Sequence, residues 1–207
     1  MGVNKYSLFY LYLSYMSNEA LDTSLVDRAI VFAVNAHAGT ERRGKGIPYI
    51  VHPLEAMAIV STITADPELL AAAVLHDTVE DTEVTLEDLR AGFGERVASL
   101  VAAESDSFTD ETGRTLDWKE RKILALNRLA LATRDEKIVT LGDKLSNMRA
   151  IARDYAAIGE DFWLRFHVTD KALHAWRYRA LADALSELAD TAAYQEFVRL
   201  IFQVFGA

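Results

Sequence analysis

The sequence predicts an all-α protein, and three observations indicate this fold class. Beyond about residue 20, Ala, Leu, Glu and Arg prevail, and apolar residues recur at helical spacing, as in LVDRAIVFAVNAH (25–37). All three prolines stand where helices begin or are about to begin. No segment shows strand-like alternation, an internal repeat or a linker rich in proline, glycine or serine. We therefore expect one helical domain over residues 20–207, preceded by an N-terminal extension over residues 1–19.

Local signals place the starts and ends of the expected helices. DPE (66–68) combines an N-cap, a first-turn proline and a first-turn acid, and we expect its helix to continue through AAAVLHDTVEDT (71–82). HP (52–53) begins the helix that precedes this one in the chain. TLED (85–88) resembles a capping box with Asp in place of Glu. GFG (92–94) ends that short helix and starts another.

Two segments are expected to be surface loops. AGTERRGKGIPY (38–49) holds three glycines and three cations, and ESDSFTDETGRTLD (104–117) is polar and acidic.

The composition suits a single domain with a core of its own. Of the 207 residues, 51% are hydrophobic, which is enough to bury a sizeable core. Cysteine is absent, which excludes disulfides, zinc–cysteine clusters and thiol nucleophiles, and suits a cytoplasmic protein. The formal net charge of −9 argues against a binder of nucleic acid or of anionic membranes.

The N-terminal extension contains an aromatic and aliphatic run from Tyr6 to Met16. The run is too short to span a bilayer as a helix, and no small-residue cleavage pattern follows it. A weak signal or interfacial anchor, an extra element packed on the domain, and an alternative start at Met16 all stay open. We therefore assign these residues no role in the function.

The end of the helix expected over 71–82 carries an unusual group of titratable side chains. His76 and Glu80 are four residues apart, as are Asp77 and Asp81, so a helix would present two stripes, each with a potential metal ligand and a carboxylate one turn beyond it. The preceding turns are small and apolar, so this end is expected inside the protein, where such groups need a cation or a polar network. The alternative is a solvated helix C-terminus, although acids there oppose the helix dipole.

Two further residues extend this group. His52 alone would be a core or capping histidine, and Asp143 alone would be a salt-bridged helix residue. With His76 and Asp77 they form the ordered pattern H…HD…D. Two imidazoles and two carboxylates suit Mn²⁺ or Fe²⁺ better than a structural zinc site, and they leave positions for water and substrate.

This pattern resembles the HD phosphohydrolase superfamily. RRGKGIPYIVHPLEAMAIV, AAAVLHDTVEDTEVTLEDLRAGFGERVASLV and KIVTLGDKLSNMRAI are similar to the hydrolase domain of RelA/SpoT enzymes, and especially to the small stand-alone alarmone hydrolases related to metazoan SpoT homologues. The resemblance covers about residues 25–155 in order, and no segment remains for a synthetase domain. It implies an HD-domain helical bundle that hydrolyses the 3′-pyrophosphate of guanosine 3′,5′-bis(diphosphate), using Mn²⁺ or another divalent transition metal.

The resemblance also assigns roles to residues. The metal ligands would be His52, His76, Asp77 and Asp143. Glu80 and Asp81 would orient or activate the attacking water. The substrate would be contacted by Arg42, Arg43, Lys45, Tyr49, Asn147 and Arg149.

The chain departs from the family pattern at two places. The usual LADRLHN reads LGDKLSN, which puts Gly142 before a ligand and Ser146 in place of a larger residue. The usual GVTK reads AAESDSF, which removes a lysine that can approach the substrate. Cations of WKERK (118–122) are candidates to replace it, with a solvated basic helix face as the alternative.

Several aromatic and basic residues of the C-terminal third could also approach a pocket. His167, Lys171 and His174 share one face of an expected helix, for which surface placement is favoured. Trp163 and Trp176 are expected in the core rather than stacked on a base.

Two other readings of the function stay open. The same site could act on another nucleotide, such as the adenine analogue (p)ppApp or NADPH. A non-catalytic nucleotide sensor is a second class, but such a protein would be expected to lose a ligand or the Glu-Asp pair, and this chain keeps both. One sequence does not reveal the preferred base or the oligomeric state.

Overall fold

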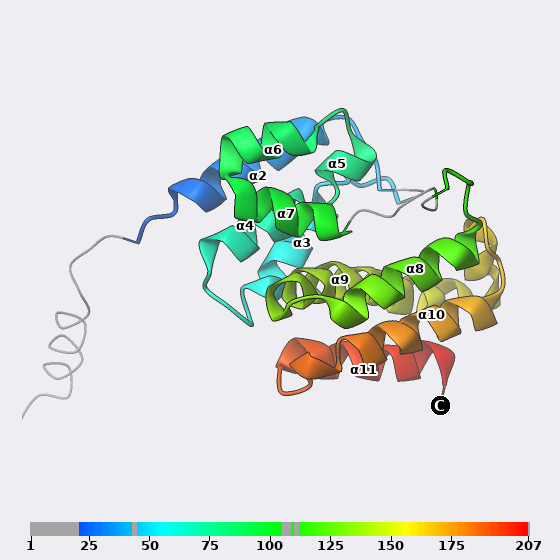
Figure 1. Ribbon diagram of the computed structural model, residues 1–207. Helices are drawn as coiled ribbons and strands as arrows, with labels where there is room; N and C mark the ends of the chain where they lie inside the picture. The colour runs from blue at the N-terminus through cyan, green and yellow to red at the C-terminus, as the bar shows by residue number, and fades with distance from the viewer. Residues whose placement is uncertain (1–20, 43–44, 105–108, 110–111, 207) are drawn as a thin grey trace, which may run out of the picture.

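The computed structural model describes residues 21–42, 45–104, 109 and 112–206 (Figure 1). The extension expected over residues 1–19, and the predicted substrate contact Arg43, lie outside the described residues. Within the described ranges all regular structure is helical, apart from two isolated β-bridges, Glu41–Pro48 and Thr109–Thr115. The predicted all-α fold class is therefore confirmed. None of the described helices combines the length and the apolar character that a membrane crossing requires.

In chain order the helices are α2 (Ser24–Ala36), α3 (Val51–Val60), α4 (Pro67–Leu75), α5 (Thr78–Asp81), α6 (Leu86–Phe93), α7 (Glu95–Glu104), α8 (Trp118–Leu131), α9 (Arg134–Ile158), the 3₁₀ helix η1 (Gly159–Arg165), α10 (Lys171–Ala184), the 3₁₀ helix η2 (Ser186–Leu188) and α11 (Ala192–Phe205). Longer connections separate α2 from α3 and α7 from α8.

The predicted capping signals act where they were expected. Asp66 Oδ1 accepts from the backbone N–H of Glu68 at 2.9 Å, with Pro67 in the first turn of α4. Thr85 and Asp88 form the reciprocal capping box of α6. Gly94 then ends that helix at a φ of 92°, a conformation that glycine adopts without strain.

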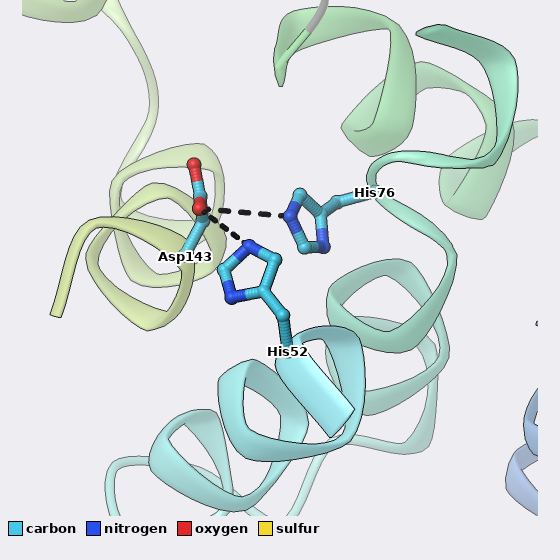
Figure 2. A group of neighbouring side chains, drawn as sticks. All are labelled: His52, His76 and Asp143. Carbon is cyan, nitrogen blue, oxygen red and sulfur yellow. Dashed lines mark ion pairs between the residues drawn. The ribbon is translucent and has the colours of Figure 1, made fainter. Parts of the chain in front are cut away.

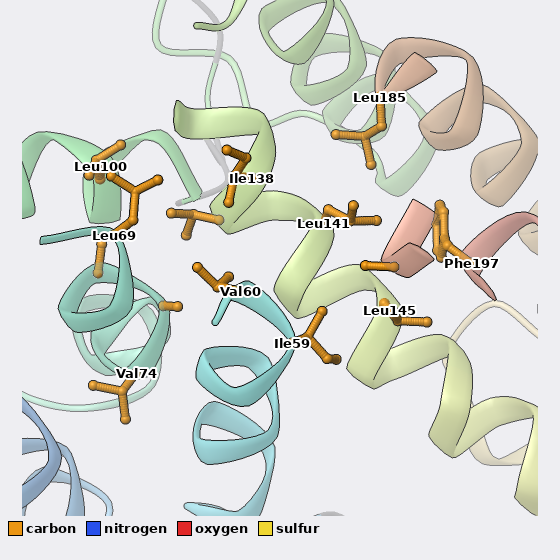
Figure 3. Close-up of a cluster of buried hydrophobic side chains, with 14 of the residues drawn as sticks. Ile59, Val60, Leu69, Val74, Leu100, Ile138, Leu141, Leu145, Leu185 and Phe197 are labelled. Atoms are coloured by element: carbon orange, nitrogen blue, oxygen red, sulfur yellow. The ribbon is translucent and has the colours of Figure 1, made fainter. Parts of the chain in front are cut away.

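The long helix α9 lies in the middle of the bundle, between the group α2 to α7 and the pair α10 and α11 (Figure 1). Leu141 and Leu145 of α9 are fully buried, with Val60 of α3 on one side and Phe197 of α11 on the other (Figure 3). This arrangement fixes α3, α4 and α9 against each other; the predicted metal ligands lie on α3 and α9 and directly after α4.

Gly142 sets how closely α9 approaches α3. A Cβ atom built at this residue would lie 2.7 Å from Val60 Cγ2 and 2.9 Å from the carbonyl oxygen of Ala56. Both distances are shorter than van der Waals contact, so only glycine permits this approach. The residue before the predicted ligand Asp143 therefore brings that ligand toward α3.

The prediction of one continuous helix over residues 71–82 is wrong, because the structure interrupts it. The helix ends at Leu75 and a separate turn of helix, α5, begins at Thr78, so His76 and Asp77 lie between them. The Thr78 hydroxyl donates to the carbonyl of Leu75 at 2.7 Å, which occupies an acceptor at the end of α4. Asp81 N–H still donates to the carbonyl of Asp77 at 2.9 Å, so Asp77 and Asp81 remain one turn apart.

Candidate metal centre

His52 stands in the first turn of α3 and is 3% exposed. Its Nδ1 lies 2.8 Å from Ser146 Oγ, and that hydroxyl donates to Glu55 Oε2 at 2.8 Å. Because the hydroxyl has one proton, Ser146 accepts from His52 Nδ1–H. The tautomer fixed in this way leaves a lone pair on Nε2, the form in which an imidazole binds a metal.

His76 follows the apolar helix α4 and is 2% exposed. Its Nδ1 lies 2.8 Å from the carbonyl oxygen of Ala73, which can only accept, so Nδ1 carries the proton. Its Nε2 is buried and forms no well-aligned hydrogen bond among the described residues, although the Asp77 carboxylate lies 2.9 Å away. A buried polar atom needs a partner, and a cation coordinated by Nε2 would supply one.

The carboxylate of Asp143 meets both imidazoles from α9 (Figure 2). Its Oδ1 lies 3.1 Å from His52 Nε2 and 3.6 Å from His76 Nε2. Among the described residues these three side chains form a group whose ligand atoms all lie within 4.8 Å of one another. The fourth predicted ligand, Asp77, adjoins them, with its Oδ2 2.9 Å from His76 Nε2 and 3.5 Å from His52 Nε2.

The charges of these groups depend on one another. Burial lowers the pKa of His76, but the carboxylates of Asp77 and Asp143 outweigh burial and hold that pKa well above its usual range. Burial raises the pKa of Asp77, but His76 outweighs it and lowers that pKa to about 2. Two carboxylates therefore hold positive charge on a buried imidazole. A divalent cation satisfies the same carboxylates, and the nitrogen and oxygen donors suit it.

Asp143 has two more partners on its own helix. Lys144 Nζ and Asn147 Nδ2 both donate to its carboxylate. Burial raises the pKa of Asp143, but Lys144 and the two histidines outweigh burial and hold it well below the usual range. Asp143 therefore stays ionised, as a metal ligand must.

A pocket of about 160 Å³ surrounds these side chains. Its lining comprises Tyr49, His52, His76, Asp77, Glu80, Glu104, Lys122, Asp143, Lys144, Asn147 and Arg177. All four predicted ligands and the predicted catalytic Glu80 therefore lie in its wall. Asp81 lines a neighbouring depression with Ala36 and Asp88, and its carboxylate is near Tyr49.

The predicted substrate contacts lie at different distances from the pocket. Tyr49 lies in the pocket wall and donates to Asp77 Oδ2 at 2.6 Å, and burial raises its pKa so that it keeps this proton. Arg42 donates to Asn147 Oδ1 at 2.9 Å, beside the pocket. Lys45 pairs with Asp154 at 2.7 Å, seven residues beyond Asn147 and about 10 Å along α9.

Arg149 is not brought into the pocket. Its Nε donates to Glu196 Oε1 of α11 at 2.7 Å, and its Nη1 donates to Glu55 Oε1 at 3.3 Å. Glu55 accepts from Ser146, and Ser146 accepts from His52. Arg149 therefore contacts His52 indirectly, through Glu55 and Ser146.

We assigned no role from the sequence to several residues of this site, and noted Ser146 only as a departure from the family pattern. Glu55 and Ser146 orient His52, and a serine three residues after Asp143 on one helix face is the only local signal for that role. Glu104 lies in the segment expected as a loop, but it ends α7 and its side chain is 5% exposed. Arg177 reaches the pocket from α10, and no motif marks it.

The basic and aromatic residues of the C-terminal third have separate positions. His174 is 5% exposed and stacks on Trp163 at 5.0 Å between ring centroids, so the surface placement favoured for it is wrong. Its Nε2 lies 2.7 Å from the carbonyl of Val168, which satisfies the buried ring. His167 is exposed, and Lys171 pairs with Glu160 at 2.8 Å. Trp163 lies in the core as predicted, and Trp176 is half-buried.

Comparisons with known proteins identify the family of the chain. The HD domain model matches residues 29–162. A guanosine-3′,5′-bis(diphosphate) 3′-pyrophosphohydrolase of Xenopus tropicalis is 38% identical over 136 residues, which cover 64% of this chain and 72% of that protein. The enzyme of the same name from Aquifex aeolicus is 35% identical over 129 residues, 61% of this chain, but the chain spans only 18% of that relative.

Two solved structures share the fold. A metazoan orthologue of SpoT that hydrolyses ppGpp is 25% identical with a TM-score of 0.69, and the match covers 89% of this chain and 97% of that one. A Listeria monocytogenes protein is 30% identical with a TM-score of 0.65, over 75% of this chain and 99% of that one. The chain therefore belongs to the HD domain family, as its histidine and aspartate pattern predicts.

Proposed function

We propose that this chain is a metal-dependent hydrolase that removes the 3′-pyrophosphate from ppGpp or pppGpp, leaving GDP or GTP. The observation that carries the proposal is the convergence of two oriented imidazole Nε2 atoms on Asp143 and Asp77 in a pocket with cationic walls. The names of the relatives support it, since a vertebrate pyrophosphohydrolase matches over 72% of its length.

We propose Mn²⁺ as the native ion, held by His52, His76, Asp77 and Asp143. The mixed nitrogen and oxygen donors support this choice over zinc, which favours histidine and cysteine. When bound, such an ion supplies Lewis-acid chemistry by polarising the phosphoryl group and acidifying water.

The remaining residues of the pocket have distinct roles in this proposal. Glu80 lies in the wall one turn beyond the ligands, where it would accept the proton of the attacking water. Asp81 would act through Tyr49, which donates to Asp77 and keeps that ligand oriented. Lys144 and Arg177 line the same pocket and would neutralise the pyrophosphate as it leaves.

The nucleoside would extend from the pocket toward Arg42, Asn147 and Lys45. Arg42 and Asn147 already contact each other beside the metal centre, and Arg43 would belong to the same loop. A small nucleotide is the partner that suits an acidic chain of net charge −9, since three cations, Lys122, Lys144 and Arg177, line the metal pocket. The absence of cysteine supports a cytoplasmic location, and residues 20–207 would act as a single hydrolase domain.

The test is release of pyrophosphate from ppGpp by protein loaded with Mn²⁺. His76→Ala and Glu80→Gln should each reduce kcat by at least about a hundredfold, the range expected for losing a metal ligand or a general base. Arg153→Gln is a matched control, because Arg153 is exposed on α9 and, within the part of the chain that the structure describes, pairs only with Asp154 at 3.5 Å. Full activity in both site variants would refute the assignment.

A substrate panel separates the proposal from its alternatives. The kcat/KM for ppGpp should exceed the values for ppApp and NADPH. A higher value for either alternative would keep the metal chemistry but change the substrate. Tight nucleotide binding without turnover of any panel member would favour the sensor.

A further inference from the structure

A second cavity adjoins the metal centre. It has a volume of about 420 Å³ and lies between α7, α8, α9 and α10. Four residues, Glu104, Lys122, Lys144 and Arg177, line both this cavity and the metal pocket. The two spaces therefore share one wall, and whatever enters the larger one meets the cations of the smaller one.

Most of the cavity wall is apolar. Ala125, Leu126 and Leu129 of α8 face Leu181 of α10 across it, and Ala102 contributes from α7. Such walls offer few partners to the hydrogen-bonding edge of a nucleobase, but they suit a hydrocarbon chain or an aromatic ring. The volume lies within the range of sites for small organic ligands, whereas the metal pocket, at about 160 Å³, has room for phosphate groups alone.

The polar part of the cavity is positively charged. Lys122, Arg128, Lys144 and Arg177 contribute four cations against the two carboxylates of Glu104 and Glu136. Glu136 is engaged elsewhere, because its Oε2 accepts from the backbone N–H of Thr133 at 2.6 Å in the capping box of α9. Among the described residues, Arg177 has neither an ion pair nor a hydrogen bond, and its only ring contact is with its neighbour Tyr178.

We propose that this cavity binds an amphiphilic anion, with an apolar body between α8 and α10 and a single anionic group against Arg177 and Lys122. Arg177 lines both the cavity and the metal pocket, so pairing with an anion in the cavity leaves its charge less available to an anion in the metal pocket. Lys144 transmits the same effect, since its Nζ contacts Asp143 and lies 3.7 Å from Glu104 in the shared wall. Occupation of the cavity therefore weakens the binding of pyrophosphate groups at the metal centre.

The binding test uses anilinonaphthalene sulfonate, a fluorescent probe with an aromatic body and one anionic group, titrated against the full chain loaded with Mn²⁺. Ala125→Phe fills the cavity and should raise the probe Kd at least about tenfold. Arg177→Gln removes a cation without changing the apolar wall, and should raise the Kd by about tenfold, the effect of losing one charge-assisted contact.

Two controls are matched to these variants. Ala130→Phe places the same ring on the exposed side of α8, outside the cavity lining, and Arg153→Gln removes a cation elsewhere. Both should bind the probe as the unsubstituted chain does. An unchanged Kd in both Ala125→Phe and Arg177→Gln would overturn the proposal, as would equal loss of binding in Ala130→Phe.

The coupling is measured without turnover, by calorimetric titration of inorganic pyrophosphate into the Mn²⁺-loaded protein. Saturating probe should raise the pyrophosphate Kd severalfold in the unsubstituted chain and leave it unchanged in Ala125→Phe. Because neither measurement involves hydrolysis, the site is tested separately from the proposed function. Equal pyrophosphate affinity with and without probe in the unsubstituted chain would refute the coupling.

Discussion

Gly142→Ala is the substitution that tests how the fold positions the metal centre. The added methyl group would lie 2.7 Å from Val60 Cγ2 and 2.9 Å from the Ala56 carbonyl oxygen. Val60 is fully buried and branched at Cβ, and the second contact is backbone, so neither neighbour can turn aside. Helices α3 and α9 must therefore separate, and they carry His52 and Asp143.

Two effects of opposite sign set the change in the free energy of unfolding that Gly142→Ala should cause. Alanine favours a helix interior over glycine by about 1 kcal/mol. Overpacking a rigid core site costs about 3 kcal/mol at the upper end of its usual range, where two contacts under 3.0 Å belong. The difference predicts a net loss of about 2 kcal/mol, or a fall in Tm of roughly 4–8 °C for a domain of this size.

Thermal unfolding of the metal-free protein measures this loss, and calorimetric titration with Mn²⁺ measures the accompanying decrease in metal affinity. Gly92→Ala is the matched control, because Gly92 lies within α6 and a Cβ there meets nothing within 4 Å. The control should be neutral or stabilised by up to about 1 kcal/mol. A Gly142→Ala protein as stable as this control, with undiminished metal affinity, would refute the close-approach argument.

Three further predictions concern the groups that hold the ligands. Ser146→Ala removes the acceptor of His52 Nδ1 and should weaken Mn²⁺ binding by about tenfold to a hundredfold at unchanged helicity, measured by calorimetry and circular dichroism. Tyr49→Phe removes the donor to Asp77 and should lower the free energy of unfolding by about 1.5–3 kcal/mol in denaturant titration; an unchanged value would exclude that hydrogen bond. The raised pKa of His76 adds stability to the metal-free protein that is fully present below the ordinary histidine pKa of 6.5 and is lost as the pH rises through the raised value. The Tm of metal-free protein should therefore fall across that rise in pH, and a flat profile there would contradict the charge assignment.

Local sequence signals predicted the starts of several helices well. DPE (66–68) and TLED (85–88) cap helices by contacts between residues two or three apart, and such contacts can be recognised in the sequence. The pairing of His52 with Asp143 was predicted from the order of a pattern, and the structure brings these side chains within 3.1 Å. That expectation depended on a family resemblance, because periodicity alone does not specify which helices meet.

The supporting residues were beyond prediction for a physical reason. Glu55, Ser146 and Arg149 act on His52 through a chain of contacts between α3, α9 and α11, and each member has an ordinary helical environment in the sequence. Arg177 could not be predicted for the same reason, since its approach to the pocket depends on how α10 packs beside α8. Contacts between residues so far apart in the chain are determined by packing, which one sequence does not display.

The interruption of the helix at His76 and Asp77 determines where these two side chains point. Successive residues of a continuous α-helix point about 100° apart, so the side chains of His76 and Asp77 would diverge if the helix continued through them. Asp77 has φ −92° and ψ −4°, away from the helical values that His76 still keeps at φ −55° and ψ −37°. The change lets the Asp77 carboxylate come within 2.9 Å of the preceding imidazole Nε2. Burial continues through the bend, because His76 is 2% exposed and Thr78 is fully buried. The apolar run thus ends where two consecutive side chains, His76 and Asp77, line one pocket, and we infer that the break in the helix serves the candidate metal centre.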